Sequence, residues 1–264
     1  MKLRTRGISG TRNQAESERE RAHRVIARKA AAEGIVLLEN NGVLPLKKGS
    51  NVALYGGGAR HTIKGGTGSG SVNNRSNVSI DEGLRNAGFT VTTDAWLDAY
   101  DAAYEQSYAE WKAYIYEISE PGNFDSLYRA HASHPMQMPK GSAITKTDAA
   151  DAIYVISRVS GEGADRKAEP GDYYLSEQEE EELKAITECY DNTIVVLNVG
   201  GVMDVSFLEK YNIAALVMLS QAGMEGGNAL ADVLSGAVTP SGKLTDTWGC
   251  HYEEVGGQSG LRKT

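Results

Sequence analysis

The chain has little cysteine, only two residues in 264, and few histidines. Cys189 and Cys250 are far apart in the sequence, and neither has a histidine at a metal-ligand spacing, so we expect two free thiols. Only His131 and His134 lie close together, in a stretch that we expect to be a loop, and a metal there is a minor alternative. We therefore expect no metal and no other cofactor.

Long apolar runs are also absent. No stretch approaches the ~18 apolar residues of a membrane span, and the polar start of the chain lacks the apolar core of a signal peptide. Acidic residues outnumber basic ones, 35 to 27, and the net charge of −8 repels phosphate backbones. The most basic stretch, 19–29, interleaves arginine with glutamate and predicts a solvated helix face. We expect a cytoplasmic protein that binds neither membranes nor nucleic acid.

What the sequence does have is a hydrophobic content of 41%, enough for a sizeable core. Continuous apolar runs predict buried parallel strands at 51–56, 89–94, 152–157, 193–200 and 213–219. Helical stretches alternate with them, including 176–190, where Ser176 and Glu179 form a capping box, and 225–236. This order predicts an α/β fold, a doubly wound, mostly parallel sheet with helices on both faces, also called an α/β sandwich.

Two segments between the predicted strands are unusual. In residues 95–117, aromatic residues recur every three or four positions, which predicts a long helix with an aromatic stripe. Such a stripe is more often part of a core or of a subunit interface than a platform for sugars. Residues 121–147, which contain scattered proline and glycine, predict an irregular excursion that could reach a neighbouring domain.

Glycine-rich loops follow three of the predicted strands, at the edge of a parallel sheet where ligands bind. The first, 55–75, does not fit a phosphate-binding loop because Lys64 precedes the glycines of 65–70 instead of following them, so nucleotide binding remains a minor alternative. Its hydroxyls, Thr67, Ser69 and Ser71, lie on a backbone that can approach a sugar closely. A flexible surface turn is the other interpretation of this loop.

The second loop, 160–172, places Glu162 between two glycines and close to several charged residues. A carboxyl group in this setting can donate a proton if a pocket closes over it and raises its pKa. A glutamate in a loop is nonetheless usually only solvated. In the third loop, 220–227, Glu225 lies at a predicted helix start, where we expect it to cap the helix.

Together these stretches resemble the α/β-sandwich domain of family-3 glycoside hydrolases, the β-glucosidase group. The resemblance covers Ala27 to Trp248 and rests on "ARKAAAEGIVLLENNGVLPL", "KGGTGSGSVN", "IYVISRVSGEGADR", "GDYYLS", "VVLNVGGVMDV", "QAGMEGGNALADVLSGAVTPSGKL" and "TDTW". It implies a retaining hydrolase of β-linked glucosides or oligosaccharides, with Glu162 as the catalytic acid/base. It also implies that Ser69 contacts the sugar, with Thr67 and Gly68 as weaker candidates.

The resemblance further implies that Asp165 and Arg166 brace the loop that carries Glu162. The family's nucleophile, an aspartate in a Ser-Asp-Trp motif, and its sugar-binding Lys-His pair belong to a barrel domain, and neither motif occurs here. We expect a helical lead-in at 1–26, the sandwich domain at 27–248 and an atypical tail at 249–264, as in members whose sandwich domain precedes the barrel.

On this interpretation the chain is a truncated product that is inactive alone, and its partner is the missing barrel domain, in cis or in trans. The uncovered surface makes a homo-oligomer plausible. A non-catalytic module that binds carbohydrate or a partner protein is the alternative function.

Overall fold

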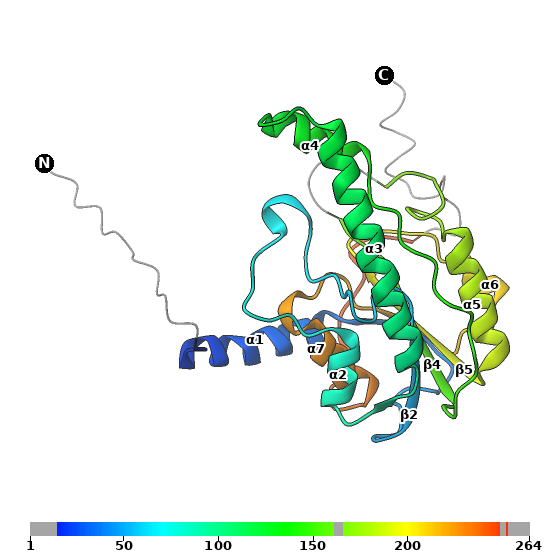
Figure 1. The fold of residues 1–264 in the computed structure, drawn as a ribbon. Helices are drawn as coiled ribbons and strands as arrows, with labels where there is room; N and C mark the ends of the chain where they lie inside the picture. The colour runs from blue at the N-terminus through cyan, green and yellow to red at the C-terminus, as the bar shows by residue number, and fades with distance from the viewer. Residues whose placement is uncertain (1–14, 161–165, 249–251, 253–264) are drawn as a thin grey trace, which may run out of the picture.

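The computed structural model describes residues 15–160, 166–248 and 252 (Figure 1). Within them, six strands form one sheet in the order β1-β6-β5-β4-β2-β3. Their bounds are β1 Val36–Asn40, β2 Asn51–Tyr55, β3 Thr90–Val91, β4 Asp151–Arg158, β5 Asn192–Val199 and β6 Ala215–Met218. Strands β2 to β6 are parallel, and β4 and β5 are buried along nearly their whole length, as the continuous apolar runs predict.

Helices cover both faces of the sheet, which confirms the predicted α/β sandwich. Helices α1, α2 and α7 lie together on one side and α5 and α6 on the other (Figure 1). Their bounds are α1 Glu18–Gly34, α2 Ile80–Asn86, α3 Asp94–Ile118, α4 Phe124–Ser133, α5 Glu177–Cys189, α6 Phe207–Lys210 and α7 Gly226–Leu234. None of the helices in the described part of the chain is long and apolar enough to cross a membrane.

Strand β1 was not among the predicted strands. It pairs antiparallel with β6 at the edge of the sheet, with an irregularity between Leu37 and Glu39. Because it is an edge strand, only its first residue is fully buried and its last two are exposed, so it lacks the continuous apolar pattern of the central strands. The sheet is therefore mixed at this edge and parallel elsewhere.

Local sequence explains where several helices begin. Capping boxes start α1, α2 and α5, and that of α5 is the predicted pair Ser176 and Glu179. Helix α1 is continuous through residues 26 and 27, where the lead-in was expected to meet the sandwich domain. It is fastened to α7 by Arg28, whose guanidinium makes two 2.6 Å bonds to the carboxylate of Asp232.

The predicted aromatic helix is α3, and its stripe divides into two parts. Trp96 and Tyr100 are buried in the core, whereas Tyr108 and Tyr114 in the later turns are largely exposed. The segment after α3 was expected to be irregular, but it contains the helix α4. Asn123 caps this helix by accepting a hydrogen bond from the backbone N–H of Ser126.

The two histidines of this segment also lie differently from the prediction. His131 is in α4, and His134 is its C-cap, so neither belongs to an extended loop. Their spacing of three residues places them about one turn apart at the C-terminal end of α4.

Candidate functional site

The loops that follow β2, β4, β5 and β6 meet at the carboxyl edge of the sheet. The backbone N–H of Gly223, after β6, donates to the carbonyl oxygen of Lys64, after β2, at 2.8 Å. The backbone N–H of Ser160, after β4, donates to the side-chain oxygen of Gln221 at 3.0 Å. The three glycine-rich loops predicted to carry the site therefore lie together, as expected for a parallel sheet.

A buried asparagine near the end of β5 joins these loops. The Asn198 side-chain oxygen accepts the backbone N–H of Ile63 at 2.6 Å, and its nitrogen donates to the carbonyl oxygens of Ile63 at 2.9 Å and Ser220 at 2.7 Å. Asn198 is 0% exposed, so these bonds are shielded from water. Sequence reasoning missed this residue, although an asparagine inside an otherwise apolar strand is a visible signal.

Ser220, which Asn198 holds, has an unusual backbone conformation. Its φ of 58° lies in the left-handed region that residues other than glycine rarely adopt. Such residues persist where the surrounding structure determines them, and they cluster at ligand sites. The backbone therefore turns sharply at the edge of the candidate site.

Glu162 and Asp165 lie in 161–165, outside the described residues. The residues on either side of this segment are well anchored. Besides its bond to Gln221, Ser160 donates its hydroxyl to the carbonyl oxygen of Gly200 at 2.9 Å. Both ends of a five-residue segment are thus fixed at the carboxyl edge, since Arg166 at its other end is also held.

Arg166 makes contacts of the kind expected of a bracing residue. Its guanidinium donates to the carboxylate of Asp172 at 2.8 Å and to the carbonyl oxygen of Arg158 at 3.4 Å. Arg158 is itself buried and paired with Glu179 on α5. Burial alone would lower the pKa of the Arg158 guanidinium, but the hydrogen bonds to Glu179 outweigh it and raise that pKa. The cation at the base of this loop therefore stays charged.

In the first loop, Thr67 precedes a short 3-10 turn, η1, at Gly68–Gly70. The Ser69 side chain lies outside the described part of the structure. The ammonium of Lys64 donates to the carbonyl oxygen of Val72 at 2.5 Å and to the side chain of Asn74 at 2.9 Å. Lys64 therefore holds the loop in shape, and its cation is engaged within the loop.

Glu225 does not cap α7 as predicted. It occupies the N-cap position, but its side chain makes no capping bond. The preceding 3-10 turn, η2 at Gly223–Glu225, already supplies an acceptor for the N–H of Gly226. The Glu225 carboxylate is instead buried, where it accepts from Arg24 on α1 at 2.6 Å and from Asn228 at 2.7 Å. Its role is to fasten α1 to α7.

Comparison with known proteins gives consistent results. The profile of the "Glycosyl hydrolase family 3 C-terminal domain" matches residues 35–261. Beta-glucosidase A of Butyrivibrio fibrisolvens is 33% identical over 91% of this chain and 30% of its own length. A beta-glucosidase of Ruminococcus albus is 34% identical over 82% of this chain and 22% of its own length.

The chain is also similar to solved structures of beta-glucosidases. A beta-glucosidase from Paenibacillus barengoltzii is 31% identical with a TM-score of 0.71, covering 94% of this chain and 26% of its own. Beta-glucosidase 3B from Thermotoga neapolitana, solved with glucose, is 33% identical with a TM-score of 0.68, covering 88% and 32%. The chain thus spans less than a third of the length of each of these relatives.

Proposed function

The chain belongs to glycoside hydrolase family 3, whose C-terminal domain it carries, and on this premise we propose that it supplies the acid/base half of a retaining β-glucosidase active site. Several of its relatives are named beta-glucosidases, and one was solved with glucose. These names support β-linked glucosides as the substrate class. Glu162 is the proposed acid/base.

The observation that carries this proposal is the anchoring of Ser160 and Arg166, the residues on either side of 161–165. Ser160 is bonded to the loops after β5 and β6, and Arg166 is bonded to Asp172 and to the end of β4. Five residues between Ser160 and Arg166 can reach only a short distance from these two fixed residues, because each residue extends the chain by at most ~3.6 Å. This supports a location for Glu162 at the ligand-binding edge of the sheet.

The proposed chemistry is double displacement. A nucleophilic carboxylate attacks the anomeric carbon while Glu162 protonates the departing glycosidic oxygen. The resulting Glu162 carboxylate then takes a proton from water, which hydrolyses the glycosyl-enzyme intermediate. In retaining enzymes the two carboxyl groups lie about 5 Å apart. We propose that a barrel domain, on the same polypeptide or on another, supplies the nucleophile and closes over Glu162.

The remaining predicted residues have supporting roles. Ser69 is proposed to contact the sugar, with Thr67 and Gly68 as further candidates, because the 3-10 turn at Gly68–Gly70 and the preceding Thr67 lie in a loop held by Lys64. Asp165 and Arg166 are proposed to brace the Glu162 segment, and the ion pair between Arg166 and Asp172 supports this for Arg166.

The experiment that tests the proposal is reconstitution. The chain would be combined with a barrel domain of the same family, fused or added separately, and assayed on an aryl β-glucoside. We expect hydrolysis from the combination, and a strong loss with Glu162→Ala but little with the matched control Glu169→Ala, which removes an exposed glutamate from the same loop. Equal activity of the two variants would refute the assignment.

Calorimetry on the isolated chain detects carbohydrate binding, and the response of hydrolysis to Glu162→Ala separates the proposal from a non-catalytic carbohydrate module. A module of that kind would bind glucose or cellobiose, and would leave hydrolysis by the reconstituted enzyme insensitive to Glu162→Ala.

A further inference from the structure

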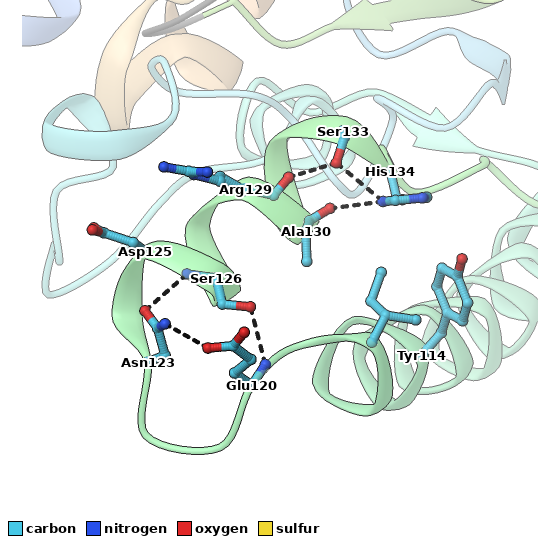
Figure 2. Close-up of a pocket in the computed structure, with 10 residues that line it drawn as sticks. Tyr114, Glu120, Asn123, Asp125, Ser126, Arg129, Ala130, Ser133 and His134 are labelled. Carbon is cyan, nitrogen blue, oxygen red and sulfur yellow. Dashed lines mark hydrogen bonds between the residues drawn. The ribbon is translucent and has the colours of Figure 1, made fainter.

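Helices α3 and α4 enclose an open groove of about 650 Å³ (Figure 2). Its α3 wall consists of Tyr114 and Ile118, which are 44% and 41% exposed. The facing wall, from α4 and the turn before it, is mostly polar and includes Asp125, Arg129 and His134. The groove therefore has one apolar wall and one wall of hydrogen-bonding groups.

The polar wall is held in shape and still has free groups. The backbone N–H of Glu120 donates to the Ser126 hydroxyl at 3.0 Å, and Asn123 donates to the Glu120 carboxylate at 2.8 Å. The guanidinium of Arg129 and the carboxylate of Asp125 make no hydrogen bond or ion pair with any residue that the structure describes. One cation and one anion are thus available to a ligand.

Helix α3, which forms one wall of the groove, is joined to the loop after β2. Arg60 in that loop pairs with Asp98 on α3 at 2.6 Å, and the His61 ring stacks on Tyr104 with centroids 3.8 Å apart. Beyond this anchor α3 continues for ten residues to Tyr114, a rise of about 15 Å. In Figure 1 the α3–α4 hairpin stands out from the sheet on the same side as the first glycine-rich loop.

Aromatic residues recur along this part of α3. Tyr104 and Tyr108 are stacked with an interplanar angle of 2°, and Trp111 follows at 5.8 Å from Tyr108. Because about 15 Å of helix separates Tyr104 from Tyr114, a ligand that spans this distance must be longer than one sugar ring.

The two walls fit a neutral, amphipathic ligand. A pyranose presents C–H groups on its faces and hydroxyls at its rim, so its face can pack on Tyr114 and its hydroxyls can bond to Arg129 and Asp125. A phosphate group fits poorly, because it would meet the carboxylates of Asp125 and Glu120 as well as the arginine.

We propose that this groove is an accessory binding site for β-linked oligosaccharides, which favours long substrates over disaccharides at the active site. The ligand class rests on the proposed function, whereas the location rests on the groove itself.

Calorimetric titration of the 264-residue chain with cellotetraose tests the proposal. We expect binding, weakened about tenfold in Tyr114→Ala and also weakened in Arg129→Ala. The matched control is Tyr116→Ala, which removes a tyrosine that is 60% exposed on the same helix but does not line the groove. This control is expected to bind as the unaltered chain does.

Three results would overturn the proposal. The first is that cellotetraose does not bind at millimolar concentration, and the second is that Tyr114→Ala and Tyr116→Ala lose the same amount of affinity. The third is that Tyr114→Ala dissociates a dimer in sedimentation while sugar binding is unchanged. Glu162→Ala is expected to leave this binding intact. Failure of the groove and failure of the acid/base assignment are therefore distinguished by different variants.

Discussion

Replacing Asn198 by alanine is expected to release the loops at the carboxyl edge from the end of β5. The substitution removes three hydrogen bonds of 2.6 to 2.9 Å that join this strand to Ile63 and Ser220, and a longer one of 3.4 Å from the Ser157 hydroxyl. Because Asn198 is fully buried, the released backbone groups must find water or remain unpaired. The loops after β2 and β6 should then separate more easily.

The expected cost follows from the number of bonds. Each contributes about 0.5–1.5 kcal/mol net, so their loss lowers the free energy of unfolding by about 3 kcal/mol. For a domain of this size that corresponds to a melting temperature about 6–12 °C lower. Asn192→Ala is the matched control at the other end of β5, because it removes a single 2.8 Å bond to Asp151 and should cost less than about 1 kcal/mol.

Urea unfolding of both variants measures these costs, and amide hydrogen exchange at Ile63 locates the effect. We expect Ile63 to exchange faster in Asn198→Ala and to be unchanged in Asn192→Ala. The reasoning is refuted if Asn198→Ala is as stable as Asn192→Ala, or if the Ile63 amide stays equally protected.

Three further substitutions test other parts of the fold. Burial raises the pKa of Glu182, so the native state loses stability as pH rises from the ordinary value of 4.5 through the raised value. Glu182→Gln lacks this titration and should therefore become more stable relative to the unaltered chain across that window. Urea titrations from about pH 4 to about pH 8 measure the difference, and a difference that does not depend on pH would contradict this. Gly227→Ala would put a methyl carbon 1.9 Å from a backbone carbonyl oxygen at the start of α2, and should cost about 3 kcal/mol in the same assay; an unchanged urea midpoint would contradict the close packing. Arg24→Ala leaves the buried Glu225 carboxylate without its cation and should cost about 2 kcal/mol, whereas a loss below about 0.5 kcal/mol would show that the pair adds little.

Much of the fold could be predicted from the sequence, because the central strands and α5 are specified locally. Strands buried on both faces require continuous apolar runs, and the Ser176 capping box is read within four residues. Strand β1 could not be predicted in this way, since its partner β6 is distant in the chain and its exposed residues break the apolar pattern. Helix α4 was not predicted because proline and glycine residues, which favour turns and loops, lie on both sides of it.

The candidate site was predictable in outline but not in its connections. Loops after parallel strands meet at one edge in any such sheet, so the three glycine-rich loops could be grouped. That Asn198 would bind two of them, or that Glu225 would turn toward Arg24 instead of capping α7, depends on contacts between residues far apart in the sequence. No local pattern specifies such contacts.

The central claim, that Glu162 donates a proton to the leaving group, is tested most directly by the dependence of hydrolysis on leaving-group ability. In the chain reconstituted with a barrel domain, kcat/KM of Glu162→Ala would be compared with that of Glu169→Ala on aryl β-glucosides of low and high phenol pKa. We expect Glu162→Ala to lose about 10²- to 10⁴-fold on the poorest leaving groups, and much less on the best. A loss that is the same for all leaving groups, or no loss on poor ones, would contradict the account.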